Sequence, residues 1–381
     1  MIRADVKPEL LIWACDRSGE NRVDLLAKFP QLDAWIGGRA SPTLKQLEKF
    51  AKSVHVSIGY LFLPKPPIER LPIPDLRTKE GRGVGRPSPD MLDAIYLCQR
   101  RQDWYRDYAR HMHEEPRAFV GSATLQSTVE SIASAMQQVL DFAVAARQNC
   151  RTTTDALTLF VAHAEAAGIL IMISGVVGNN GQRALNPEEF RGFALADELA
   201  PVIFINGADS KSAQMFTLAH ELAHLWLGES AVSDVALTTR TLTNKTEAWC
   251  NRVAAEFLVP LDHLKNVEFD DPIEQLREIA RNFKVSVLVI LRRLLDAGMI
   301  TQEQFGEAYS DELRRLSAAK SSKPGGSFYN TLPVRVSRRF ASALVRSALE
   351  GNTLFRDAYQ LLGITKDKTF KEFGKRLGYD S

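Results

Sequence analysis

Two histidines and a glutamate stand at a spacing that can hold a metal ion and use it for hydrolysis. His220, Glu221 and His224 lie in the segment 215–227, which reads MFTLAHELAHLWL. On a helix, residues four apart lie about 40° from each other around the axis and one turn along it, so both imidazoles can reach one ion. Glu221 lies about 100° further round, where it can take a proton from a metal-bound water. The pattern predicts a hydrolytic site with zinc as its cofactor.

The same segment has a second interpretation, in which it is a core helix that happens to contain two histidines. Its other residues are apolar nearly all the way round, and a helix that is apolar on every side is buried. Buried imidazoles and a buried carboxylate need partners, because an unpaired buried polar group costs roughly 1–3 kcal/mol and a charge costs more. A metal ion supplies that partner, so the apolar surroundings favour the metal site.

A third ligand is expected in the helical segment 247–260, which ends at a proline. Glu247 shares a helix face with Asn251, whereas Glu256 points almost oppositely, so only one of the two carboxylates can face the ion. We expect Glu247 to be the ligand and Asn251 to orient a ligand or the backbone. The alternative leaves Glu247 as an exposed carboxylate in the first turn, where the helix dipole favours a negative charge.

Length and composition limit the classes of protein that the chain can belong to. With 381 residues, the chain is expected to form two to four structural units. A net charge of +2 means that any basic surface must be local. The four cysteines lie far apart and form no Cys-x-x-Cys pair, which argues against a disulfide scaffold and a zinc ribbon. Since no signal peptide opens the chain and no apolar run reaches about 18 residues, we expect a cytoplasmic protein with no membrane contact.

Residues 1–64 are expected to form a bundle of short helices. The predicted helices cover 8–15, 22–29, 32–36, 43–53 and 57–63, with glycines and prolines at the breaks. These proportions are typical of a helix-turn-helix domain, and the segment resembles the lambda-repressor-like (XRE) family of DNA-binding domains.

The XRE resemblance implies specific positions at DNA. Its third helix enters the major groove, which would place Gln31, Asp33 and Trp35 near DNA. Arg39 and Lys45 would lie near phosphate. Because the third helix carries no Arg or Lys, binding to a protein or to a second copy of the domain remains open beside DNA binding.

Residues 65–89 hold the densest proline and glycine of the chain, which predicts a linker. Four cations in it, Arg77, Lys79, Arg82 and Arg86, could contact nucleic acid, although a solvated basic linker is the simpler interpretation. Helices are expected at 89–113, 127–147 and 152–167.

Three short strands are expected before the metal helix, at 169–173, 191–195 and 201–206, with a turn at 197–200. A sheet edge beside the metal can hold an extended peptide by main-chain hydrogen bonds. Asp209 or Ser212 is expected to cap the metal helix.

The residues around the metal motif resemble those of a known family. Segments 201–206, 216–224 and 247–260 are similar to the ImmA/IrrE family of zinc metallopeptidases, and the whole chain resembles members fused to an XRE domain. The resemblance implies a gluzincin-like fold and a bacterial transcriptional repressor as the protein substrate. It also implies His220, His224 and Glu247 as zinc ligands and Glu221 as the general acid and base.

The expected fold class is α+β and mostly helical. The peptidase is expected at 90–300 with its core at 150–265, and helices at 272–286 and 287–297 are expected to pack around that core. In the alternative, these two helices have helix-turn-helix proportions, and Arg281, Arg292 and Arg293 are available to contact phosphate groups. A second linker is expected at 317–326, followed by a helical partner-binding module at 327–381.

A rival function also fits the sequence. In it the chain is a non-proteolytic DNA-binding regulator or antitoxin-like protein with a structural zinc, paired with a toxin-like or regulatory protein. The intact Glu221 favours the peptidase, because a purely structural site has no use for an acid beside the metal.

Overall fold

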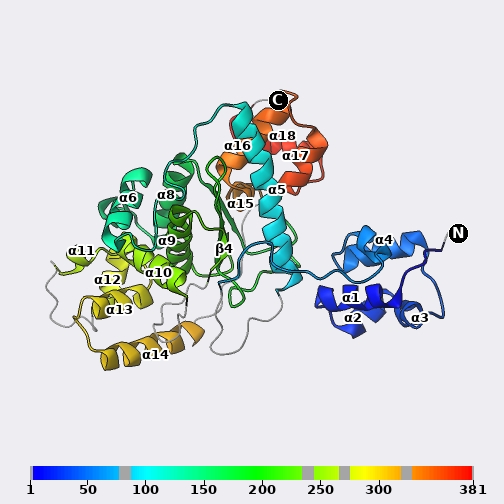
Figure 1. Ribbon diagram of the computed structural model, residues 1–381, viewed down its shortest axis with the longest axis horizontal. Coiled ribbons are helices and arrows are strands. Elements are labelled where there is room, and N and C mark those ends of the chain that lie inside the picture. Colours follow the sequence, from blue (N-terminus) through cyan, green and yellow to red (C-terminus); the bar gives the residue numbers. More distant parts are fainter. Residues whose placement is uncertain (1–2, 77–86, 234–243, 266–274, 319–327, 380–381) are drawn as a thin grey trace. The chain divides into compact units, whose positions relative to one another are not determined.

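The computed structural model describes residues 3–76, 87–233, 244–265, 275–318 and 328–379 (Figure 1). It contains two compact units, one formed by Met1–Leu71 with Arg86–Leu92 and the other by Pro72–Gly85 with Asp93–Ser381. The two expected linkers overlap residues 77–86 and 319–327, which lie outside the described residues, as do Arg77, Lys79, Arg82 and Arg86.

The first unit is a bundle of short helices, as the sequence predicts. It contains α1 (Pro8–Ser18), α2 (Arg22–Lys28), α3 (Leu32–Ile36), α4 (Leu44–Ser53) and the 3-10 helix η1 (Ile58–Phe62). Local signals set these bounds: Gly19 ends α1 with a left-handed φ of 64°, and Thr43 and Gln46 form a capping box at the start of α4. The ion pair from Arg17 Nε to Glu69 Oε1, at 2.8 Å, keeps the chain beyond residue 64 within this unit.

The residues expected at DNA divide into two groups. Gln31, Arg39 and Lys45 are exposed, so either DNA or a protein partner could contact them. Trp35 is only 3% exposed and packs against the rings of Phe29 and Phe50. The expected position of Trp35 near DNA is therefore wrong, because its indole belongs to the core of the bundle. Asp33 forms an exposed ion pair with Arg22, at 2.7 Å.

The second unit is built on a small mixed sheet. Its strands are β1 (Leu170–Ser174), β2 (Gly192–Leu195), β3 (Val202–Asn206) and β4 (Ala231–Val232), in the order β1-β3-β2-β4. β1 and β3 are parallel, and β2 is antiparallel to both β3 and β4. The α+β, mostly helical class is confirmed. The expected count of three strands is wrong, because β4 has only two residues and gives no periodic signal.

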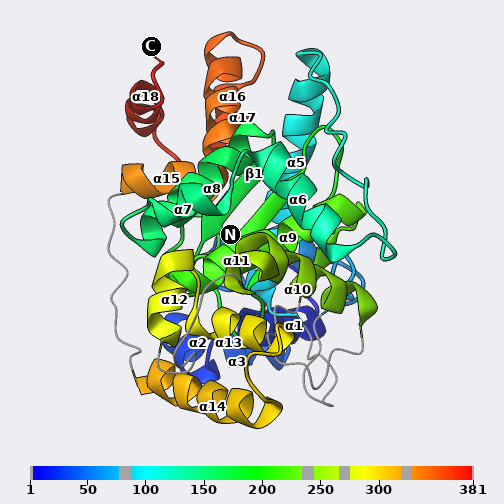
Figure 2. The same ribbon diagram turned by 90° about the vertical axis from the view of Figure 1, so that its left-hand side faces the viewer.

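Helices cover this sheet and the region around it (Figures 1 and 2). The lead-in contains α5 (Pro89–His111), α6 (Val129–Leu140), α7 (Val144–Gln148) and α8 (Thr153–Ala166). The single helix expected at 127–147 is divided because Asp141 has a left-handed φ of 48°. The long helix α9 (Lys211–Leu227) packs against β2 and β3 on one side and against α10 (Lys245–Leu258) on another. Four helices follow: α11 (Leu261–Lys265), α12 (Leu276–Phe283), α13 (Val287–Asp296) and α14 (Gln302–Ala318).

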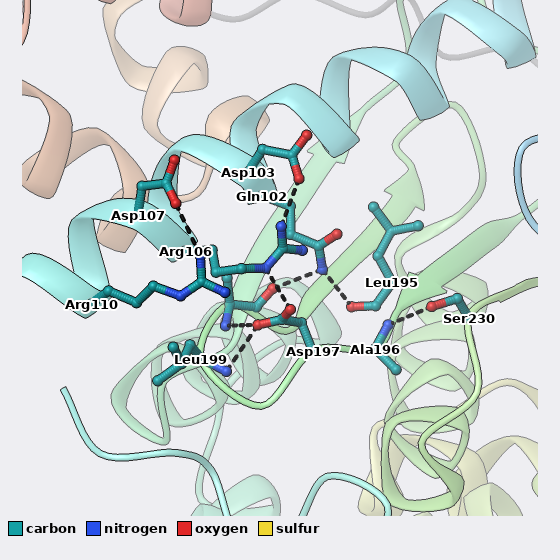
Figure 3. A network of polar contacts seen from close by, with 11 residues as sticks. Gln102, Asp103, Arg106, Asp107, Arg110, Leu195, Ala196, Asp197, Leu199 and Ser230 are labelled. Carbon is teal, nitrogen blue, oxygen red and sulfur yellow. Dashed lines mark hydrogen bonds and ion pairs between the residues drawn. The ribbon is translucent and has the colours of Figure 1, made fainter.

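A polar network holds the turn between β2 and β3 against α5 (Figure 3). Gln102 of α5 donates from Nε2 to the carbonyl oxygens of Leu195, at 3.0 Å, and Ala200, at 2.9 Å. Arg106, one turn further along α5, donates to Asp197 at 2.6 Å. These contacts satisfy the carbonyls of the turn and fix β2, the strand that lies next to the candidate site.

The C-terminal tail lies within the second unit. It consists of α15 (Phe328–Val336), α16 (Arg338–Leu349), α17 (Phe355–Leu362) and α18 (Asp367–Arg376), so the helical expectation is confirmed. α15 and α16 contact β1. Arg339 forms an ion pair with Glu114 at 2.8 Å, and Asn179 donates to the carbonyl of Leu362 at 3.0 Å. The tail is thus packed on β1 and the segments beside it, and its binding of a partner remains a prediction.

Two further observations concern the whole chain. Among the described residues, no helix has the length and apolar character needed to cross a membrane. The four cysteines, Cys15, Cys98, Cys150 and Cys250, are all free thiols, and only Cys150 is partly exposed.

Candidate metal centre

Helix α9 carries the first three residues of the candidate site. Its N-cap is Ser210, whose hydroxyl accepts from the backbone N–H of Ala213 at 3.2 Å, so the expected caps Asp209 and Ser212 are wrong. The helix ends at Gly228, which adopts a left-handed φ of 72°. Between these ends the helix is buried on nearly every side, and the side chains of His220, Glu221 and His224 have no exposed surface.

Helix α10 brings the expected third ligand to the two histidines. Glu247 stands in its first turn and is fully buried. Its Oε2 lies 3.3 Å from Nε2 of His220 and its Oε1 lies 3.1 Å from Nε2 of His224. The two Nε2 atoms are 3.1 Å apart, and one ligand atom from each residue fits within 4.8 Å of the others. The alternative of an exposed Glu247 is therefore wrong.

The protonation pattern of this cluster fits a cation at its centre. Nδ1 of His220 lies 2.9 Å from Oδ1 of Asn251. An amide oxygen only accepts, so Nδ1 carries a proton. Burial acts to lower the pKa of His220, but the Glu247 carboxylate outweighs it and raises the pKa, so a bound cation would take the place of the proton on Nε2. Lone pairs and a carboxylate directed at one point repel each other unless a positive ion lies between them. Two imidazole nitrogens and one carboxylate are a donor set that suits zinc.

The ionisation of the cluster in the chain alone is strongly perturbed. Burial acts to raise the pKa of Glu247, but the neighbouring imidazoles of His220 and His224 outweigh it and hold the pKa at about 2. Burial raises the pKa of Glu221 to about 8, against the opposing effect of His220. Burial lowers the pKa of His224. Such shifts are common where ionisable groups are gathered for function.

Two residues beside Glu221 were missed by the sequence analysis. Ser233, directly after β4, donates from Oγ to Oε2 of Glu221 at 3.0 Å. Gly192 opens β2, and a Cβ atom there would lie 3.0 Å from Oε1 of Glu221 and 2.7 Å from Cγ2 of Thr217. The missing side chain lets β2 approach α9 closely. Neither residue has a local sequence signal, because Gly192 reaches Glu221 through the packing of β2 against α9 and Ser233 reaches it through the pairing of β4 with β2.

The second carboxylate of α10 has a different role. Glu256 forms an ion pair with Arg293 of α13, and its Oε1 accepts from the backbone N–H of Leu261 at 3.3 Å. Arg293 is 3% exposed and also donates to the carbonyl of Val259 at 2.9 Å. Glu256 therefore cannot face the ion in this fold. Arg293 is not available to phosphate, which agrees with the packing interpretation of α12 and α13.

We expect Asn251→Ala to weaken metal binding by roughly 10–100-fold, because the ring of His220 loses the partner that fixes its orientation and tautomer. Competition with a chromophoric chelator measures this affinity. The matched control is Asn149→Ala, which removes an exposed asparagine from the end of α7 and should leave the affinity unchanged. Equal affinities in the two variants would show that Asn251 does not orient the ligand.

Comparison with known families agrees with part of this picture. Residues 164–295 match the peptidase M78 model described as the IrrE N-terminal-like domain. This segment contains β1 to β4, α9 and α10, and with them all the residues of the candidate centre, so the match supports a peptidase. Residues 336–376 match a model described as a domain of unknown function (DUF8813). No curated protein matches the chain.

Proposed function

We propose that the chain is a zinc-dependent endopeptidase controlled through its N-terminal unit. The observation that carries the proposal is the convergence of the ligand atoms of His220, His224 and Glu247 at one buried point beside Glu221. The similarity of residues 164–295 to a peptidase domain supports it independently. The protein substrate that the ImmA/IrrE resemblance implies is a transcriptional repressor.

The residues of the centre have separable roles in this proposal. When bound, zinc would polarise the scissile carbonyl and increase the acidity of a water molecule. Glu221 takes the proton from that water and returns it to the leaving amine. Ser233 holds Oε2 of Glu221, while Oε1 has no hydrogen-bond partner among the described residues. Asn251 fixes the ring of His220, so the chain supplies both the proton carrier and its alignment.

The N-terminal unit is proposed to bind a regulatory ligand, either DNA or a protein partner. The exposed side chains of Gln31, Arg39 and Lys45 are available to both. Asp33 of α3, which is paired with Arg22 at 2.7 Å, is a carboxylate near these side chains in the sequence and opposes phosphate. A protein partner is therefore supported at least as well as DNA.

Removal of the metal tests the proposed activity. The full-length protein is incubated with a lysate of the cells in which it occurs, and new protein N-termini are identified by mass spectrometry. We expect specific termini that disappear with a zinc chelator and return when zinc is restored, because the proposed cleavage depends on a zinc ion that polarises the carbonyl. His224→Ala is the control and should produce none of them. An identical set of termini with and without chelator would contradict the proposal.

A further inference from the structure

The outer edge of β4 is covered by the chain itself. The backbone N–H of Leu76 donates to the carbonyl of Val232 at 2.9 Å, and the N–H of Val232 donates to the carbonyl of Pro74 at 2.9 Å. Asp75 and Val232 form a parallel bridge, and Ile73 is only 8% exposed. We call residues 73–76 the strap. The strap and β4 belong to the same compact unit.

The covered edge lies next to the candidate proton carrier. Val232 is followed directly by Ser233, whose hydroxyl donates to Glu221 at 3.0 Å. The register partner of Val232 on β2 is Phe193, which follows Gly192, the residue that approaches the other carboxylate oxygen of Glu221. A polypeptide paired with Val232 therefore lies beside Ser233, the residue whose hydroxyl contacts the carboxylate of Glu221.

Strand edges of this kind bind extended peptides through main-chain hydrogen bonds. β4 is the edge strand next to β2, and β2 packs against α9, the helix that carries His220, Glu221 and His224. The opposite edge strand, β1, is separated from β4 by β3 and β2 and packs against α15 and α16. An extended substrate that pairs with the sheet beside the centre would therefore use the main-chain groups of Val232, which the strap already occupies.

We propose that the strap is an internal competitor of the substrate: it occupies the edge of β4 where an extended polypeptide pairs for cleavage, and it must leave before a substrate binds. This inference rests on the proposed peptidase function. Pairing is parallel and uses two backbone hydrogen bonds to Val232, which a competing strand could replace with its own. Pro72 and Pro74 lack N–H groups and cannot extend the pairing with donors of their own. At Val232 the strap is therefore held by two main-chain contacts together with the burial of Ile73, and a substrate that pairs with Val232 must displace both.

Because of its position in the chain, the strap could respond to a ligand that binds the first unit. It begins two residues after Leu71, the last residue of the segment Met1–Leu71 in the first unit. A ligand that binds the first unit acts on a segment covalently continuous with the strap. Release of the strap would then couple that binding event to access at β4.

Hydrogen–deuterium exchange tests the contact independently of any activity. Leu76→Pro removes the N–H that donates to Val232, while its restriction of Asp75 to extended conformations is compatible with a strand. Leu76→Ala is the matched control, because it removes the same side chain and keeps the N–H. In the full-length protein we expect the Val232 amide to exchange roughly 2- to 10-fold faster in Leu76→Pro than in Leu76→Ala. Equal exchange would overturn the pairing.

Binding and cleavage of fluorescein-labelled casein, an unfolded protein probe, test the competition. We expect Leu76→Pro to have a KM roughly 2- to 10-fold lower than Leu76→Ala with an unchanged kcat, since the catalytic residues are untouched. Binding of the same probe, measured in the Glu221→Gln background, should tighten by the same factor.

The outcomes separate the strap from the peptidase. Cleavage at equal KM in the two Leu76 variants, or equal probe binding, would overturn the strap and leave the peptidase in place. Tighter probe binding in Leu76→Pro without cleavage by any variant would reject the peptidase and support the strap as a cover over a peptide-binding edge.

Discussion

Glu221→Gln is expected to remove turnover while zinc and the fold are retained. Glutamine has nearly the same size, and its amide oxygen can still accept the hydrogen bond from Ser233, but it cannot accept a proton. The loss of general acid and base catalysis is expected to lower kcat by roughly 10²–10⁴-fold. The measurement is cleavage of labelled casein, or of the natural substrate once identified, beside zinc content by elemental analysis and thermal unfolding.

The control for this substitution is Glu303→Gln. Glu303 is exposed in the first turn of α14, so its variant changes the same charge without touching the centre. Unchanged turnover in Glu221→Gln would exclude Glu221 as the proton carrier. If Glu221→Gln also replaces the wild type fully in cells while His220→Ala and His224→Ala fail, the function is that of a non-proteolytic regulator or antitoxin-like protein with a structural zinc.

The candidate centre could be predicted because its ligands are recognised from short stretches of sequence within single helices. His220 and His224 are related by one helical turn, and the apolar residues around them indicate burial. The opposite directions of Glu247 and Glu256 on one helix also follow from periodicity alone. The structure places Glu247 beside the two histidines and Glu256 beside Arg293. What periodicity could not supply was the partner of Glu256.

The features that sequence analysis missed depend on long-range pairing. β4 has two residues and is a strand only because Phe193 and Ala194 of β2 pair with it. Ser233 approaches Glu221 for the same reason. The strap was expected to be part of a linker, since it lies in residues 65–89, which hold the densest proline and glycine of the chain. Backbone pairing with a distant segment does not depend on the pattern of apolar and polar side chains, so this pattern cannot predict it.

Burial in the first unit shows a related limit. A five-residue helix such as α3 has too few positions for its pattern to distinguish a ligand-facing aromatic from a core aromatic. Trp35 is resolved as a core residue by its packing against Phe29 and Phe50, which lie on other segments. Gln31, Arg39 and Lys45 are exposed on this unit, where a partner can contact them.

Glu247→Ala is expected to have the second largest effect, the loss of stoichiometric zinc. The wild type should hold about one zinc per chain through three protein ligands, which is the usual number at a catalytic zinc. Removing a direct ligand should weaken binding by more than the roughly 10–100-fold typical of losing an orienting partner. Elemental analysis after dialysis against a weak chelator measures the zinc content of each variant.

The matched variant is Glu256→Ala, which removes the other buried carboxylate of α10. It should keep zinc but lose stability, because the buried Arg293 would keep only the more distant carboxylate of Asp296, at 3.5 Å; breaking a buried pair with no second partner typically costs about 3–5 kcal/mol, so the loss should not exceed this. Urea unfolding of the zinc-loaded proteins measures this cost. The opposite pattern, with zinc retained in Glu247→Ala and lost from folded Glu256→Ala, would reassign the third ligand. Since Glu256 accepts from the backbone of Leu261 as well as from Arg293, such a reassignment would require the end of α10 to repack.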